Sequence, residues 1–188
     1  RVSGQLLKHL EISKSFRSYH VQNEHKVVSG LVQQLVAGQS AALITDAGTP
    51  GISDPGYLLI RACLDAGIEV QCLPGPTAFV PALVVSGLPA HHFYFEGFLP
   101  HKKGRKTRLE FLATLEDTFI LYESPHRLVR CLSELIVVCG ADRPASVSRE
   151  LSKMHEEVVR GSLQELHNWA EAKDKVKGEI VVVVGGLS

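Results

Sequence analysis

The sequence has 188 residues, of which 45% are hydrophobic and 21% are charged, and its formal net charge is zero. That balance predicts a folded globular chain with a hydrophobic core, and it excludes a disordered or strongly basic protein. No run approaches the roughly 18–20 consecutive apolar residues of a membrane span, and no secretory signal opens the chain. The four cysteines form no C-x-x-C pair. A reduced, cytoplasmic protein is therefore predicted.

The first ten residues predict a helix, Arg1 to Leu10, with Ser3 as its cap. The chain begins at Arg1, and its only methionine is Met154. We therefore expect a first strand upstream of this sequence.

Short apolar runs and amphipathic stretches alternate over the first half of the chain. Apolar residues at helical spacing predict helices that begin at Asn23, near Pro55 and at Thr77, each ending at a glycine. Three runs predict strands: 16–21, 41–45 and 70–73. Because alternating strands and helices are typical of a parallel, doubly wound sheet, we predict an α/β domain over residues 1–89.

A change in composition at residues 88–91 predicts a domain boundary, with a second α/β domain over residues 90–188. Its predicted strands are 92–98, 118–122, 145–149, 158–161 and 180–184. Its predicted helices are one that carries Leu109, Leu112 and Leu115, and two at 125–139 and 163–172. Because these elements do not alternate regularly, we predict a mixed sheet.

Three loops at predicted strand ends are rich in glycine, proline and polar side chains: 46–56, 74–77 and 122–127. In each loop a potential helix cap stands next to a proline; the caps are Asp54, Thr77 and Ser124. Helix N-termini attract anionic groups, and open α/β sheets bind ligands at the carboxyl ends of their strands. We therefore predict that the three loops converge on one ligand cleft. The alternative is that each loop is only a tight, well-capped turn.

Several common ligand motifs are missing from the sequence. It contains no G-x-G-x-x-G dinucleotide fingerprint, no G-x-x-x-x-G-K-[ST] phosphate loop and no G-x-S-x-G elbow. The nine histidines do not cluster at metal-ligand spacings, and the adjacent His91 and His92 would point to opposite faces of a strand. No metal site is therefore predicted.

Six motifs occur in order along nearly the whole chain. They are LITDAGTPGISDPGY (43–57), LPGPT (73–77), FEGFLP (95–100), YESPHRL (122–128), RELSK (149–153) and KGEI (177–180). Together they resemble the family of ribosomal RNA small-subunit methyltransferases that 2'-O-methylate a cytidine in 16S rRNA, within the tetrapyrrole-methylase superfamily. The resemblance implies a two-domain α/β fold and S-adenosylmethionine as the cofactor. Family members open with a strand and a Pro/Gly/Asn loop that this sequence lacks, which implies an incomplete cofactor cleft.

The resemblance also assigns residues to the cofactor. Those that would line its methionine and ribose side are Asp46, Ala47, Gly48, Thr49, Ile52 and Ser53. Those that would flank its methionine portion are Gly75, Pro76, Thr77 and Ala78. Those that would approach the adenosine are Tyr122, Glu123 and the strand end at Arg149–Glu150.

Two carboxylates are candidates for a general base that accepts the proton of a ribose hydroxyl. Glu123 is the first candidate and Asp54 is the second. The structural alternative for Asp54 is a helix cap, and that for Glu123 is an ion pair with Arg127.

The stretch from 101 to 108 concentrates positive charge in an otherwise neutral protein. Its basic residues are Lys102, Lys103, Arg105, Lys106 and Arg108. Such a patch suits contacts with RNA phosphates, and the alternative is an ordinary solvated surface. With the resemblance, the predicted partners are 16S rRNA in the small ribosomal subunit and a second copy of the chain in a homodimer.

Two other functions remain open from the sequence. One is a methyltransferase that acts on a tetrapyrrole or another small molecule, against which the basic stretch and the motifs at 122–128 and 149–153 are weak indications. The other is a non-catalytic remnant that binds RNA or a ligand, which the absent opening segment suggests.

Overall fold

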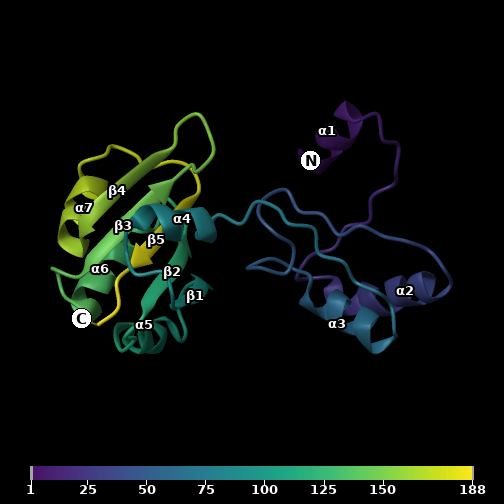
Figure 1. The fold of residues 1–188 in the computed structure, drawn as a ribbon, viewed down its shortest axis with the longest axis horizontal. Helices are drawn as coiled ribbons and strands as arrows, with labels where there is room; N and C mark the ends of the chain where they lie inside the picture. Colours follow the sequence, from purple (N-terminus) through teal and green to yellow (C-terminus); the bar gives the residue numbers. More distant parts are fainter. Residues whose placement is uncertain (1, 188) are drawn as a thin grey trace. The chain divides into compact units, whose positions relative to one another are not determined.

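A computed structural model describes residues 2–187 of the chain. These residues form two compact units, the first ending at Thr77 and the second beginning at Ala78 (Figure 1). The division lies ahead of the boundary at residues 89 and 90 that composition suggested. The reason is local: the helix after Thr77 packs on the sheet of the second unit.

The first unit contains three helices, α1 (Val2–His9), α2 (Glu24–Val36) and α3 (Tyr57–Asp65). Of the predicted first helix, Arg1 lies outside the described residues. Helix α2 packs against α3, and Cys63 of α3 is the one buried hydrophobic side chain that residues 2–77 contribute. Gly38 follows α2 with a φ of 92°, a left-handed conformation that suits glycine and ends the helix as predicted.

The three strands predicted in the first unit are not formed among residues 2–77. The segments 16–21, 41–45 and 70–73 have no strand partner there, and apolar side chains in them, such as Ile44 and Leu73, are exposed. An extended segment becomes a strand only when a neighbour satisfies its backbone groups. The predicted parallel sheet of the first domain is therefore corrected for this structure.

The second unit is built around one five-stranded mixed sheet, as predicted. Its helices are α4 (Phe79–Ser86), α5 (Arg105–Ala113), α6 (Leu128–Cys139) and α7 (Leu163–Glu171). Its strands are β1 (Phe93–Phe98), β2 (Thr118–Glu123), β3 (Pro144–Arg149), β4 (Glu157–Ser162) and β5 (Ile180–Val184). The strand order is β1-β2-β5-β3-β4, with β1 and β2 parallel and the other neighbours antiparallel.

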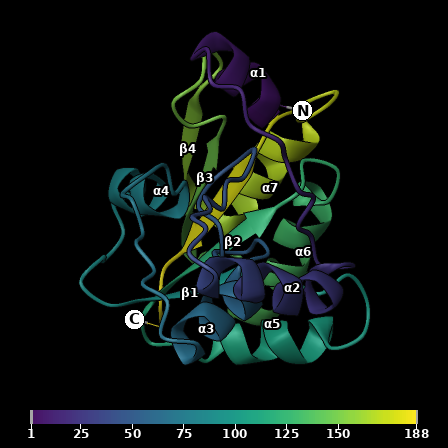
Figure 2. The ribbon, with the colours of Figure 1, turned by 90° about the vertical axis from the view of Figure 1, so that its right-hand side faces the viewer.

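Helices cover both faces of this sheet (Figure 2). Phe119 and Leu121 of β2 pack with α5, α6 and α7. Ile120 between them packs with α4 on the other face. The alternation of side chains along a strand places successive residues on opposite faces, so β2 contributes to both layers of the core.

Strand β1 carries a bulge. Phe95 pairs with Ile120, and the next paired residue is Gly97, opposite Leu121, so Glu96 is an extra residue in the strand. Gly97 has a φ of 73°, which glycine adopts without steric cost. Phe95 and Phe98 consequently share one face, and both rings contact Tyr122 of β2.

Candidate functional site

The two polar loops of the first unit, 46–56 and 74–77, are joined by side-chain hydroxyl groups. Thr49 Oγ1 lies 2.7 Å from Thr77 Oγ1 and donates a hydrogen bond to the Pro76 carbonyl oxygen at 3.1 Å. With that donor assigned, the Thr77 hydroxyl donates to the Thr49 oxygen. The structure therefore brings together Thr49, Pro76 and Thr77, three residues that the resemblance assigned to one ligand.

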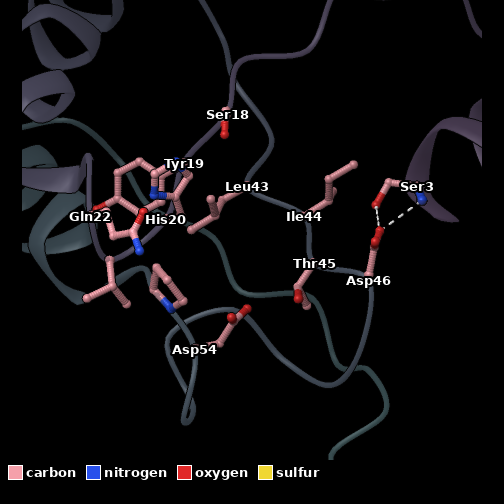
Figure 3. A pocket seen from close by; sticks show the side chains of 12 residues that line it. Ser3, Ser18, Tyr19, His20, Gln22, Leu43, Ile44, Thr45, Asp46 and Asp54 are labelled. Carbon is pink, nitrogen blue, oxygen red and sulfur yellow. Dashed lines mark hydrogen bonds between the residues drawn. The ribbon is translucent and has the colours of Figure 1, made fainter. Parts of the chain in front are cut away.

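Asp46, at the start of the first loop, accepts hydrogen bonds from both donors of Ser3 in α1 (Figure 3). Its Oδ1 atom lies 3.0 Å from the Ser3 backbone nitrogen and 2.5 Å from Oγ. The hydrogen bond from the Ser3 hydroxyl lowers the pKa of Asp46 from 3.8 to about 2, because it stabilises the charged carboxylate. Ser3, predicted as a helix cap, anchors this loop instead.

An open pocket of about 620 Å³ lies beside this loop within the first unit (Figure 3). Its lining residues are Ser3, Ser18, Tyr19, His20, Val21, Gln22, Leu43, Ile44, Thr45, Asp46, Asp54 and Pro55. Two of the predicted site residues, Asp46 and Asp54, thus line one hollow.

The loop residues at 47–53 present backbone to the solvent. Ala47, Gly48, Ile52 and Ser53 are exposed, and a Cβ atom on Gly48 would meet nothing within 4 Å. Ser53 has a φ of 53°, an uncommon conformation for a residue with a side chain. The loop is therefore open to a ligand that approaches its backbone closely.

The three predicted helix caps do not cap helices. Helix α3 begins at Tyr57 with Gly56 as its N-cap, α4 begins after Ala78, and α6 begins after Arg127. Gly56 occupies that place because a Cβ atom there would lie 2.9 Å from the Gly51 backbone nitrogen. The Asp54 carboxylate has no hydrogen-bond partner among residues 2–187. It therefore remains available to a ligand.

Glu123, at the end of β2, is buried, with an exposed fraction of 2%. Its Oε1 atom accepts a hydrogen bond from the Ser124 backbone nitrogen at 2.7 Å and pairs with Arg127 Nη2 at 2.8 Å. Its Oε2 atom lies 3.6 Å from Arg105 Nη2. Two guanidinium groups thus face this buried carboxylate and occupy its surroundings. The ion pair that was the structural alternative for Glu123 is present.

Four of the six sequence motifs meet at one edge of the sheet in the second unit. Strands β1 and β2 are parallel and end there, and the pairing of β5 with both β2 and β3 places Ile180 beside Glu123 and Arg149. Glu150 follows Arg149 with a φ of 52° and accepts a hydrogen bond from the Glu179 backbone nitrogen at 2.9 Å. Tyr122, half-buried, lies at this edge too.

The basic residues of the stretch 101–108 differ in their exposure and in their partners. Lys102, Lys103 and Lys106 are exposed. Arg108 pairs with Glu96, at 2.7 Å between Nε and Oε1 and 2.6 Å between Nη2 and Oε2, and Arg105 is buried. The two guanidinium groups thus have carboxylate partners within the unit, and the Lys106 Nζ atom lies 3.7 Å from Glu110 Oε1. Of the five basic residues predicted to bind RNA, Lys102 and Lys103 have no ion-pair partner among residues 2–187.

Among residues 2–187, no group of three or more His, Cys, Asp or Glu side chains is placed to hold a metal ion. Within the same residues, no helix is long and apolar enough to cross a membrane.

Residues 5–167 match the family model of the Tetrapyrrole (Corrin/Porphyrin) Methylases. The chain belongs to the tetrapyrrole methylase family. Its relatives include the Ribosomal RNA small subunit methyltransferase I of Xylella fastidiosa, which is 45% identical over 190 residues that cover 100% of this chain and 70% of that protein. The protein of the same name from Mycobacterium tuberculosis H37Rv is 52% identical over 162 residues, or 86% of this chain and 56% of that protein. This tetrapyrrole methylase thus spans little more than half the length of the mycobacterial relative.

Solved structures show the same fold at low sequence identity. Uroporphyrin-III C-methyl transferase from Thermus thermophilus, complexed with S-adenyl homocysteine, has a TM-score of 0.60 and 20% identity, over 95% of this chain and 80% of that one. The methyltransferase CobJ has a TM-score of 0.64 and 20% identity, over 93% and 74% of the two chains. The prediction of a tetrapyrrole-methylase-like fold is confirmed.

Some contacts in this tetrapyrrole methylase could not be read from its sequence. Arg105 hydrogen-bonds to Glu134, which is 29 residues away, and Arg108 to Glu96 on a neighbouring element. No pattern in the sequence pairs these residues, because a charge on a helix face ordinarily predicts exposure. Glu134 was therefore missed, although it is one of the residues that bury Arg105.

Proposed function

We propose that this chain is an S-adenosylmethionine-dependent methyltransferase that methylates the 2'-hydroxyl of a cytidine in the 16S rRNA of the small ribosomal subunit. The observation that carries the proposal is 45% identity over the whole chain to a relative named Ribosomal RNA small subunit methyltransferase I. The six motifs, four of them at one sheet edge, support it. The chain covers 70% of that relative and 56% of the mycobacterial one, so the activity is proposed for the protein to which these residues belong.

The residues present fit the cofactor in chemical type. S-adenosylmethionine carries an ammonium, a carboxylate, ribose hydroxyls and the methyl group on a cationic sulfur. The open loop around Gly48 offers backbone amides to a carboxylate, and Asp46 offers carboxylate oxygens to an ammonium or to hydroxyls. We propose that these residues hold the methionine and ribose parts, together with Thr49 and Thr77.

Methyl transfer to a ribose oxygen depends mainly on positioning. The cofactor supplies a methyl group whose leaving partner is a neutral thioether, so no acid is required. The protein must align the 2'-oxygen with the carbon–sulfur bond, and a base can accept the hydroxyl proton. We propose Asp54 for that base, because its carboxylate has no partner among residues 2–187 whereas Glu123 is held by Arg105 and Arg127.

Replacing Asp54 tests whether Asp54 or Glu123 is the base. Asp54→Asn should lower the rate of methyl transfer by about 10²–10⁴-fold and leave cofactor affinity within a few-fold. The rate is measured with radiolabelled cofactor and small ribosomal subunits, and the affinity by calorimetry. A rate that stays within twofold of the unchanged protein would exclude Asp54 as the base.

The substrate is tested by offering three acceptors in parallel: small ribosomal subunits, naked 16S rRNA and a tetrapyrrole. We expect label in the rRNA only. An RNA with 2'-deoxycytidine at the target should bind but accept no methyl group, since the missing hydroxyl is the nucleophile. Methylation of the deoxy substrate would show that a base atom is the acceptor.

A small-molecule methyltransferase is the second candidate. It is favoured by the family description and by the likeness in fold to a uroporphyrin-III methyltransferase. That likeness, at 20% identity, concerns the fold alone. Label in the tetrapyrrole and not in rRNA would select this candidate. A chain that binds no S-adenosylmethionine by calorimetry would instead be a non-catalytic remnant.

The cellular setting is part of the proposal. We propose that the protein is a homodimer in the cytoplasm. The four cysteines are free thiols in the structure, which suits a reducing compartment; they are Cys63, Cys72, Cys131 and Cys139. Light scattering after gel filtration measures the mass directly. A mass of one chain at micromolar concentration would argue against the dimer.

A further inference from the structure

Arg105 opens helix α5 in the middle of the basic stretch, yet its exposed fraction is only 5%. Its Nε atom donates to Glu134 Oε2 at 2.7 Å, and its Nη1 atom donates to the Pro100 carbonyl oxygen at 3.2 Å. Its Nη2 atom faces Glu123 Oε2 at 3.6 Å. A buried cation is tolerated only with such partners. Arg105 is therefore turned away from any phosphate at the surface.

The partners of Arg105 come from three places: the loop after β1, the end of β2 and helix α6. Burial is the largest influence on the pKa of Arg105 and lowers it, but the hydrogen bond to Glu134 and the neighbouring charges, those of Glu134 and Glu123 among them, together raise the pKa above its ordinary value. The guanidinium therefore remains charged. Because one rigid fork reaches all three elements, it fixes the loop after β1 against the other two.

A second arginine makes the same connection. Arg127 pairs with Glu123 at 2.8 Å, and its Nη1 atom lies 2.7 Å from Nδ1 of His101. Pro100 and His101 are thus held at the start of the basic loop, and Arg105 is held at its end. Gly104, with a φ of 82°, provides the turn between the loop and α5.

The exposed ammonium groups lie on this held segment. Lys102 and Lys103 stand between the two anchored ends, and Lys106 follows Arg105 by one residue. A loop that is already ordered loses less conformational entropy when it binds a ligand, so its affinity is higher for the same contacts.

We propose that Arg105 is a positioning residue that preorganises the loop 101–104, so that Lys102 and Lys103 face RNA phosphates in a fixed arrangement. The inference rests on the proposed function, because it takes RNA as the ligand. It replaces a direct phosphate contact, which the sequence predicted for Arg105, with an action through its neighbours.

Salt dependence distinguishes positioning from contact. Arg105→Met should weaken binding of fluorescently labelled 16S rRNA about tenfold. A loss of that size is expected when a few side chains must be ordered on binding and no longer beforehand. The slope of log affinity against log salt, measured between about 50 and 200 mM, should not change, since the same phosphates are contacted. Lys103→Met should instead reduce the magnitude of that slope by about 0.7–0.9.

Kinetics and hydrogen exchange separate positioning from general destabilisation. In Arg105→Met, KM for small ribosomal subunits should rise and kcat should persist, whereas partial unfolding would lower the apparent kcat at unchanged KM. Amide exchange at 101–104 should accelerate without RNA. Arg130→Met is the matched control: Arg130 donates to the same Glu134 at 2.9 Å, but its side chain is 68% exposed. It should change neither the RNA affinity nor the exchange.

Glu134→Gln provides a variant that keeps the shape of the side chain if Arg105→Met fails to fold. It should show faster exchange at 101–104 and a smaller loss of RNA affinity. A slope lowered by Arg105→Met as by Lys103→Met would overturn the proposal, as would unchanged exchange and affinity in the folded variants. Salt-dependent RNA binding by the unchanged chain tests the proposed function separately, and its absence would refute both.

Discussion

The two units of this protein contain similar patterns of apolar and polar residues, but only one of them assembles a sheet. Residues 78–187 hold every buried hydrophobic side chain described except Cys63, and they form five paired strands. Residues 2–77 contain three helices and extended segments with exposed apolar side chains. Local sequence thus predicts where a strand can form, and pairing decides whether it does. The second unit derives its stability from packing, and the first presents its loops to the solvent.

The largest expected effect tests this difference in packing. Leu121→Ala, in the fully buried centre of β2, should lower the free energy of unfolding of the second unit by about 2–5 kcal/mol. Leu64→Ala, on helix α3 and 54% exposed, should change stability by less than about 0.5 kcal/mol. Urea denaturation is followed by the fluorescence of Trp169, the only tryptophan, which reports on the second unit, and by far-ultraviolet circular dichroism, which reports on the helices of both units. Equal losses in the two variants would contradict the comparison.

Two glycines, one in each unit, extend the comparison of packing between the units. Gly178 has a φ of 95°, and a Cβ atom there would overlap the Glu150 side chain, whereas Gly48 in the first unit faces open space. Gly178→Ala should destabilise the second unit by about 1–3 kcal/mol through strain and displacement of Glu150.

The control for that substitution is Gly140→Ala, since Gly140 has a φ of 92° and nothing within 4 Å of its Cβ position. It carries the backbone strain without the clash, so it should cost less. Trp169 fluorescence in urea compares the two variants. A larger loss at Gly140 than at Gly178 would show that the Glu150 contact contributes nothing.

The hydroxyl pair between the two loops of the first unit should affect ligand binding more than stability. Thr77→Val keeps the shape and removes one hydrogen bond, worth about 0.5–1.5 kcal/mol. We expect affinity for S-adenosylmethionine to fall about 2- to 10-fold by calorimetry. Thr114→Val, which removes a hydroxyl that bonds only to Phe111 within the second unit, should leave that affinity unchanged.

The smallest effect concerns the anchoring of α1. The pKa of Asp46 is depressed from 3.8 to about 2, so the Ser3 contact stabilises the protein above pH 3.8 and is lost as pH falls toward 2. Ser3→Ala removes the hydroxyl and should raise the pKa of Asp46 toward 3.8, measured by NMR titration of its carboxyl carbon. A value that stays near 2 would assign the depression to another donor.

Much of the second unit could be predicted from the sequence. The strand at 180–184 was predicted with its observed bounds, and β1 and β2 within one residue, because a continuous apolar run or an alternating one fits a sheet with covered faces. The end of α4 at Gly87, with a φ of 75°, followed from glycine's tolerance of that conformation.

The rest depended on contacts that a local pattern does not contain. Asp54 was predicted to cap a helix because it precedes a proline, but the close approach of Gly56 to Gly51 places the helix start later. Arg105 was predicted at an RNA surface because it lies among lysines, but its side chain is buried and donates a hydrogen bond to Glu134. In both cases the residue that determines the outcome becomes a neighbour only when the chain has folded.

The bulge in β1 has a consequence for how this protein can change over time. Because Glu96 is an extra residue, Phe95 and Phe98 lie on the same face although three positions separate them. Deleting Glu96 would restore strict alternation and leave Phe95 and Phe98 two positions apart, still on the same face. A deletion in a strand without a bulge, such as β5, would instead turn the side chains that follow it to the opposite face. The pairing of β1 should therefore tolerate the loss of Glu96 better than the pairing of β5 tolerates the loss of any one residue.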